Sequence, residues 1–334
     1  EDWPYFDDND PINTYDPLYV NAVVSNPPYS QAWDPTNKEH DSRYSRFGLA
    51  PKSKADYAFL LHDLFHLQPD GIMAIVLPHG VLFRGGEEGE IRKNLIEQNH
   101  IDAIIGLPAN IFFGTGIPTI IMILRQEREN TDVLIIDASK GFVKEGKNNK
   151  LRASDIKRIT DTYINREDTD KYSRKISREE IRNNDYNLNI PRYIDSSEKA
   201  ENWDIYASMF GGIPNAELEE LNKYWSAFPN LKNDLFVDNG IPYVELAVSD
   251  IKNSIKNHKD VKEFYQKFKN SFDSLPDYLN TELIGNMLNL NIAHTEDKLC
   301  YNIFDRFNNI PIIDKYEAYQ ILDDEWVNIS IDLE

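Results

Sequence analysis

The residues best suited to chemistry in this sequence are four consecutive ones, Asn26-Pro27-Pro28-Tyr29, which directly follow a short β-branched run. An exocyclic amino group on a base or an amide is a poor nucleophile, because its lone pair is delocalised into the π system. Two oxygen acceptors that hold its two N–H bonds would localise that lone pair for attack on a methyl donor. The side-chain oxygen of Asn26 is one such acceptor, and the main-chain carbonyl of Pro27 is the other. Pro28 restricts the residue before it to extended geometry, so this carbonyl is aimed in advance.

Such an arrangement would be a case of electrostatic preorganisation, because both oxygens face the charge that develops in the transition state. The ring of Tyr29 can then stack on a planar substrate, and base–aromatic stacking is worth ~1–3 kcal/mol. A substrate base in duplex DNA would have to be flipped out of the stack to reach such a pocket. Two prolines after a strand are also ordinary turn residues, so the tetrapeptide alone favours a turn and a site equally.

The elements expected around this motif alternate between strands and helices. Residues 18–30 predict a buried strand that ends in a rigid loop, and the spacing of apolar residues in 53–68 predicts a helix. The other expected elements are a turn at 69–71, a helix at 90–98, and strands at 72–77, 101–107, 119–124 and 133–138. This order is typical of a parallel sheet with helices on both faces. The last two strands leave no room for a helix between them, so we expect them to form an antiparallel edge.

The charge of the chain is strongly acidic. Thirty-six Lys and Arg against 56 Asp and Glu give a net charge of −20, which argues against binding of nucleic acid or an anionic membrane through bulk charge. Residues 140–192 differ, since fourteen basic against nine acidic residues make them +5. This stretch could touch DNA phosphates, but acids are interspersed with its bases, and a solvated loop explains it better.

The C-terminal part reads as acidic and helical. Two apolar stripes predict helices, the first at Leu218, Leu221, Trp225 and Phe228 and the second at Ile251, Ile255, Phe264, Phe268 and Phe272. We therefore expect an α/β domain at 1–195 and a mainly helical region at 196–334, suited to contacts with other proteins.

Several classes of protein are disfavoured by composition. The single cysteine, Cys300, allows no internal disulfide and fits a reducing cytoplasm. No apolar run approaches the ~20 residues of a membrane span, and no secretion signal is visible. The histidines show no metal-ligand spacing, so no metal site is expected. His79 follows a predicted strand, where ligands bind in open sheets, although a lone histidine is more often structural.

Beyond the tetrapeptide, the order of motifs resembles the N6-adenine DNA methyltransferases, and specifically the modification (M) subunit of type I restriction–modification systems. The segments that carry the resemblance are Lys54–Phe59, Ala74–Gly85, Ile105–Phe112, Gly114–Thr119 and Asp185–Tyr193, with a weaker one at Tyr316–Gln320 and Trp326. They cover residues 18–193 well. The resemblance implies the distal part of a Rossmann-like methyltransferase sheet, followed by a subunit-interaction region.

The resemblance also implies roles for individual residues. Asn26, Pro27 and Pro28 would form the catalytic loop that holds the adenine amino group, and Tyr29 would stack on the base, with Phe112 as a second stacking wall. Asp56, Tyr57 and Phe59 lie where the sheet of this family meets the methyl donor, S-adenosylmethionine, and are candidate cofactor contacts. For Tyr57, Phe59 and Phe112, ordinary packing remains an equal alternative.

The main cofactor motif of that family is missing from this chain. A glycine-rich turn after the first strand and an acidic residue after the second belong upstream of the tetrapeptide, and the residues before Asn26 are too few to hold them. We therefore expect a fragment lacking its N-terminal part, or a cofactor-binding half supplied by another chain, and no methylation by this chain alone. The implied partners are a DNA specificity (S) subunit, a second M subunit, a restriction (R) subunit and, through the complex, double-stranded DNA, with no membrane.

Two other functions remain open at this stage. A protein glutamine-N5 methyltransferase uses the same chemistry on an amide and also carries Asn-Pro-Pro-Tyr. A non-catalytic subunit that only scaffolds a complex would keep the sequence pattern without using it. The long helical tail and the ordered downstream motifs disfavour the glutamine alternative.

Overall fold

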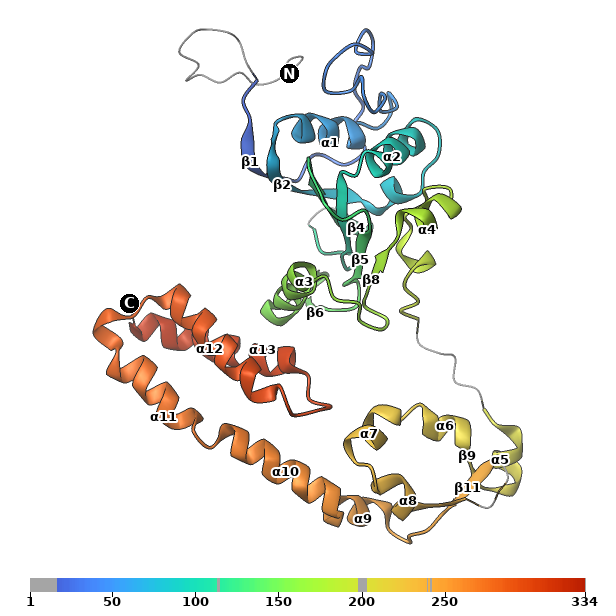
Figure 1. Cartoon of the computed structure of the whole chain (residues 1–334), viewed down its shortest axis with the longest axis vertical. Helices are drawn as coiled ribbons and strands as arrows, with labels where there is room; N and C mark the ends of the chain where they lie inside the picture. The colour runs from blue at the N-terminus through green and yellow to red at the C-terminus, as the bar shows by residue number, and fades with distance from the viewer. Residues whose placement is uncertain (1–16, 113–114, 198–202, 239, 241, 334) are drawn as a thin grey trace. The chain divides into compact units, whose positions relative to one another are not determined.

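The computed structural model describes residues 17–112, 115–197, 203–238, 240 and 242–333 (Figure 1). It divides into two compact units, residues 1–198 and 199–334. The first unit is built on a central sheet, and the second is mainly helical.

The central sheet has the strand order β1-β2-β4-β3-β5-β8. Its strands are β1 (Val20–Ser25), β2 (Leu67–Pro78), β3 (Ile101–Gly106), β4 (Thr119–Arg125), β5 (Val133–Asp137) and β8 (Ser173–Ile176). Strands β1, β2, β3 and β5 run in one direction, while β4 and β8 run in the other. The carboxyl ends of β1, β2, β3 and β5 therefore share one edge of the sheet.

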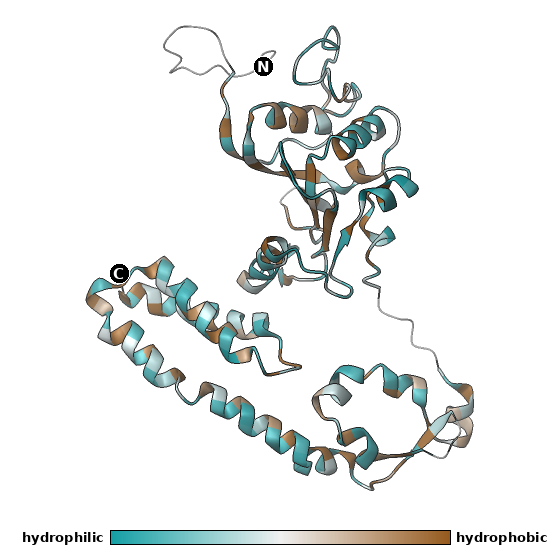
Figure 2. Ribbon diagram, viewed as in Figure 1, coloured by the Kyte–Doolittle hydropathy of each residue, from teal (hydrophilic) through white to brown (hydrophobic). Residues whose placement is uncertain are grey.

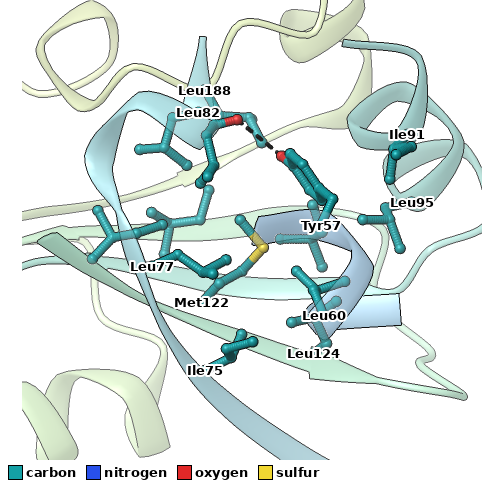
Figure 3. Close-up of a cluster of buried hydrophobic side chains, with 14 of the residues drawn as sticks. Tyr57, Leu60, Ile75, Leu77, Leu82, Ile91, Leu95, Met122, Leu124 and Leu188 are labelled. Carbon is teal, nitrogen blue, oxygen red and sulfur yellow. Dashed lines mark hydrogen bonds between the residues drawn. The ribbon is translucent and has the colours of Figure 1, made fainter. Parts of the chain in front are cut away.

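Helices cover both faces of this sheet, as the apolar pattern predicts. Helices α1 (Asp56–Phe65) and α2 (Glu87–Glu97) pack on one face, and α3 (Ala153–Asn165) packs on the other. Successive residues of β4 point to opposite faces of the sheet: Met122 joins the cluster under α1 and α2, and Ile123 joins the cluster under α3. The brown strands in Figure 2 and the side chains in Figure 3 show this apolar interior.

The first strand differs from the prediction in its burial. Val24, the fifth residue of β1, is 90% exposed. Its neighbour Val23 packs on the cluster under α1 and α2, so Val24 points to the opposite face of this edge strand, where it joins no apolar cluster of the described residues. The turn predicted at 69–71 is also wrong, since these residues lie inside β2. They lie at a shift in register between β1 and β2, where Val20 pairs with Leu67 but Ala22 pairs with Ile72, so β2 has the extra residues. A Cβ at Gly71 would lie 3.0 Å from the backbone oxygen of Asn21, so this glycine allows the close approach.

Two further expectations for the first unit need correction. Strand β4 is antiparallel but lies between β2 and β3 rather than at an edge, and β5 runs parallel to β3. The antiparallel edge strand is β8, from the basic stretch 140–192. That stretch is not a solvated loop, because its elements are β6 (Val143–Glu145), β7 (Asn148–Lys150), α3, β8, α4 (Arg178–Asn183) and the short helix η2 (Ile190–Arg192).

The second unit contains helices around two apolar clusters. Its helices are α5 (Ile205–Phe210), α6 (Asn215–Glu219), α7 (Asn222–Ala227), α8 (Leu231–Leu235), α9 (Ile251–Asn257), α10 (Lys259–Phe272), α11 (Leu275–Leu279), η3 (Asn280–Gly285), η4 (Met287–Asn289), α12 (Ile292–Phe307) and α13 (Lys315–Leu333). A three-stranded sheet, which the sequence did not suggest, joins β10 (Phe236–Asp238), β11 (Tyr243–Leu246) and β9 (Ile213–Pro214).

Each predicted apolar stripe of this unit is split over two helices. In the first stripe, Leu218 lies in α6 and Trp225 in α7, and the other two residues flank α7. Residues 251–272 fall on α9 and α10, which are separated by the extended backbone of His258. Phe228 and Phe272 nevertheless point into apolar clusters. Within the described residues, no helix has both the length and the apolar character needed to cross a bilayer.

Candidate active site

The candidate site lies at the edge where the carboxyl ends of the parallel strands meet. Asn26 directly follows β1, and His79 directly follows β2 in the short helix η1 (His79–Leu82). In open sheets with helices on both faces, ligands bind outside these strand ends. The tetrapeptide Asn26–Tyr29 thus has the position that a site of this architecture requires.

The side chains of Asn26 and Tyr29 are joined within the loop. The Tyr29 hydroxyl donates a hydrogen bond of 2.9 Å to Oδ1 of Asn26. Burial raises the pKa of the Tyr29 hydroxyl above its ordinary value, so the group stays protonated and can donate. Asn26 is exposed and Tyr29 is half-buried. A carbonyl oxygen has two lone pairs, so Oδ1 can accept a second donor from outside the loop.

A buried carboxylate anchors the loop to the start of α1. The backbone N–H of Ser30 donates to Oδ1 of Asp56 at 2.6 Å, and Nη1 of Arg84 donates to Oδ2 of Asp56 at 3.2 Å. Arg84 also bridges to Glu88 at 2.9 Å. Since Asp56 is only 1% exposed, the loop is held by charge-assisted bonds that water does not weaken. Asp56 therefore acts on the tetrapeptide through its backbone.

Phe112 is brought next to Tyr29, although it comes from the loop after β3. The two ring centroids lie 6.5 Å apart, and the rings meet edge to face at 68°. Phe112 also packs against the apolar cluster under α3. The two aromatic residues predicted to contact a planar substrate are therefore neighbours, but they do not form two parallel walls.

The three residues predicted to contact the cofactor lie in α1, beside the loop, and the side chains of two of them are buried. Tyr57 is fully buried, and its hydroxyl donates to the carbonyl of Val81 at 2.9 Å (Figure 3). Burial raises the pKa of Tyr57 to about 12. Both carboxylate oxygens of Asp56 accept hydrogen bonds, one from Ser30 and one from Arg84. Phe59 is half-buried and packs against the core, so only this residue keeps part of its ring exposed.

The model of the N-6 DNA Methylase family matches residues 8–202, which include every candidate site residue. This match spans more than half of the 334-residue chain. The chain belongs to the N-6 DNA Methylase family. The matched range contains Asn26–Tyr29, whose role as a site stays a prediction.

Individual relatives of this N-6 DNA methylase chain carry related names. The type I restriction enzyme MpnII methylase subunit of Mycoplasma pneumoniae is 42% identical over 189 residues, which cover 55% of this chain and 35% of that protein. The MjaVIII methylase subunit of Methanocaldococcus jannaschii is 34% identical over 233 residues, 66% of this chain and 39% of that protein. The chain thus spans less than two fifths of the length of these curated relatives.

A solved structure supports the fold of the first unit. The type I restriction–modification system methyltransferase subunit from Streptococcus thermophilus is 53% identical, with a TM-score of 0.55. The match covers 59% of this chain and 40% of that one. The mixed α/β fold with a helical C-terminal region is therefore the fold of a methylase subunit.

Arg84 is a residue of the candidate site that the sequence did not single out. It sits at the centre of the Asp56 clamp and lies four residues before Glu88, a helical spacing that favours an ion pair. Phe83 was also missed; it is 44% exposed, and its ring lies 5.5 Å from that of His79. Burial lowers the pKa of His79, so its imidazole is neutral at pH 7. In the sequence, the four-residue spacing of Arg84 and Glu88 could have indicated their ion pair. No residue pattern near Phe83 distinguished it.

The placement of Tyr57 leads to a test of its role. Replacing Tyr57 with Phe should cost only about 1 kcal/mol of unfolding free energy, because Nη1 of Arg92 also donates to the Val81 carbonyl and keeps it paired. The measurement is amide hydrogen exchange of α1, compared with the unchanged chain. A direct cofactor contact would instead show as weaker binding of S-adenosylmethionine in the assembled enzyme, with α1 exchange unaffected.

Proposed function

We propose that this chain carries the base-binding part of an adenine-N6 DNA methyltransferase, as a modification subunit of a type I restriction–modification system. The observation that carries the proposal is the exposed Oδ1 of Asn26, oriented by Tyr29 and set beside Phe112 at the carboxyl edge of the sheet. Family membership and the names of the relatives support the same reaction. DNA as the substrate and adenine as the base are part of the proposal.

The loop residues would act on the amino group of a flipped adenine. Oδ1 of Asn26 accepts one N–H through its second lone pair, and the carbonyl of Pro27 accepts the other. Among the residues that the structure describes, no backbone N–H donates to the Pro27 carbonyl, which leaves it available. As the bond from nitrogen to the methyl carbon forms, positive charge builds on the nitrogen and both oxygens stabilise it. One N–H proton then leaves to water.

S-adenosylmethionine would supply the methyl group when bound, its sulfur–methyl bond breaking as the new bond forms. Asp56 and Tyr57 do not fit as direct ligands of this cofactor. The carboxylate of Asp56 is already paired with Ser30 and Arg84, and the side chain of Tyr57 is fully buried. We assign them to positioning instead: Asp56 holds the catalytic loop and Tyr57 holds α1. The cofactor-binding half of the site would come from an upstream segment or from another chain.

The proposed partners are a DNA specificity subunit, a second modification subunit and a restriction subunit, with duplex DNA bound through the complex. The acidic charge of −20 favours DNA reading by a partner rather than by this chain. Large apolar side chains stand exposed on and beside α5, namely Trp203, Ile205, Tyr206, Met209 and Phe210. Exposed apolar residues in such a cluster are typical of protein–protein contacts.

The reaction can be tested on the complex isolated from cells through a tag on this chain. We expect tritiated methyl from S-adenosylmethionine to enter duplex DNA, with N6-methyladenine as the labelled nucleoside after digestion. The chain purified alone should transfer no label. Label on protein glutamine would favour the alternative methyltransferase, and an assembled complex without any transfer would favour a scaffold.

A further inference from the structure

A second polar site lies at the same edge of the sheet, beyond the end of β5. A cavity of about 260 Å³ opens between the residues after Asp137 and the start of α3. Four cationic side chains line it, Lys140, Arg152, Arg158 and Lys171, together with the carboxylates of Asp137 and Asp155. The formal charge of this lining is +2, in a chain whose net charge is −20.

The two carboxylates are occupied by neighbouring groups. The oxygens of Asp137 accept from the Ser139 backbone N–H at 3.1 Å and from the Ser196 hydroxyl at 2.6 Å. The oxygens of Asp155 accept from the backbone and the guanidinium of Arg152 at 2.9 to 3.1 Å. Both acids therefore shape the wall of the cavity, and they compensate only part of its positive charge.

The cationic groups are held in place by the local fold. Arg152 is the N-cap residue of α3, and Asp155 and Arg158 follow it at three-residue spacing in the first turns of that helix. The Arg158 guanidinium carbon lies 4.9 Å from the ring centroid of Tyr172, a cation–π contact that orients it. A Cβ at Gly141 would come within 2.9 Å of Oδ1 of Asp155, so only glycine lets the backbone close this wall.

Two exposed lysines complete the mouth of the cavity. Lys140 is tied to the Ser196 carbonyl by its ammonium group, and Lys171 stands in a positive-φ position at the turn before β8. Asp137 is near enough to His79 for its charge to act on the pKa of that imidazole, which links the cavity to the site after β2. The cavity and the candidate base site thus belong to one edge of the first unit.

We propose that this cavity binds a phosphate group. Its chemistry is that of an oxyanion site, because arginine and lysine side chains give its lining a net positive charge around a space of that size. This assignment rests on the proposed function: the phosphate is a diester of the DNA strand whose adenine enters the loop at Asn26. Free phosphate offers the same chemistry, and the experiment separates the two sources.

The test uses a double variant with a matched control. Lys140→Ala with Lys171→Ala removes two exposed charges from the cavity, and Lys144→Ala with Lys147→Ala removes two exposed charges from the β6–β7 hairpin outside it. Inorganic phosphate is titrated into each chain by calorimetry. A fluorescent duplex is titrated with each tagged complex over a range of salt concentrations.

We expect phosphate affinity to fall at least tenfold in the cavity variant and to stay unchanged in the control. The slope of log affinity against log salt for DNA is negative, and its magnitude should fall by about 1 in the cavity variant, as expected for one lost phosphate contact. An unchanged slope, with phosphate binding lost, would keep the site and assign it to free phosphate. Absence of phosphate binding, or equal losses in both variants, would overturn the proposal. The phosphate arm needs no methyl transfer, so it stands or falls apart from the proposed reaction.

Discussion

Replacing Asn26 with Ala is expected to lower methyl transfer by the assembled enzyme about 100- to 1,000-fold. The variant loses the side-chain oxygen that localises the amino lone pair, and removal of one preorganised group of this kind typically costs that much. Assembly and stability should be preserved, since Asn26 is exposed and the Tyr29 hydroxyl that donates to it lies in the same loop. The rate of tritium transfer to duplex DNA at saturating DNA measures the effect.

The matched control for this variant is Asn21→Ala. Asn21 is also an exposed asparagine, and it lies in the same edge strand, upstream of the loop. We expect its methyl transfer to equal that of the unchanged enzyme. Tyr29→Phe should fall between the two, because it keeps the ring but removes the hydroxyl that orients Oδ1. Full activity of Asn26→Ala would place the chemistry elsewhere, and loss of assembly would assign Asn26 a structural role.

The largest loss of stability is expected for Asp102→Asn, at about 3–5 kcal/mol. Asp102 is 5% exposed at the start of β3 and binds Arg128 at 3.0 Å, Arg166 at 2.8 Å and the Tyr163 hydroxyl at 2.7 Å. It therefore joins the sheet to α3 and to the segment after β4. Removal of its charge leaves the buried guanidinium of Arg128 without its counter-ion, whereas Arg166 keeps its ion pair with Asp132.

Hydrogen exchange of the β3 and β5 amides measures this loss within the first unit alone, which avoids treating two units as one transition. Glu145→Gln is the control, because Glu145 forms an ion pair with Lys150 in which both side chains are largely exposed. Such a pair is worth at most about 1 kcal/mol. Equal effects of the two variants would show that the Asp102 network contributes no more than a surface pair.

The same network predicts how stability depends on pH. Burial opposes ionisation of Asp102, but the hydrogen bond from Tyr163 and the charges of Arg128 and Arg166 outweigh it and hold the pKa below its ordinary value. A lowered pKa in the folded state contributes stability above the unfolded value of about 3.9, and that contribution is lost as the pH falls through the folded value. The unchanged chain should therefore lose more stability below about pH 4 than Asp102→Asn does.

Periodicity predicted the elements of the first unit well, because each strand and helix shows its own local pattern. Residues 72–77, 101–107 and 133–138 are apolar runs of strand length, and β2, β3 and β5 occupy them to within one residue. Residues 53–68 carry a helical stripe, and α1 occupies 56–65 of them, while 67 and 68 already belong to β2. The order of the strands in the sheet could not be predicted from periodicity. Nothing local in 119–124 tells that β4 inserts between β2 and β3, since strand order is set by packing between distant segments.

The backbone of the loop Asn26–Tyr29 was predictable from the sequence, because the two prolines restrict their own backbone and that of the residues before them. The aromatic contact between Tyr29 and Phe112, residues far apart in the chain, was suggested by family resemblance, while its edge-to-face geometry came from the fold. Only the tertiary structure showed that Asp56 and Tyr57 hold the loop and the core, because burial depends on what packs around a side chain. The same holds for the phosphate cavity: its cations are scattered over residues 140–171, and the folding of α3 against the end of β5 gathers them around one space.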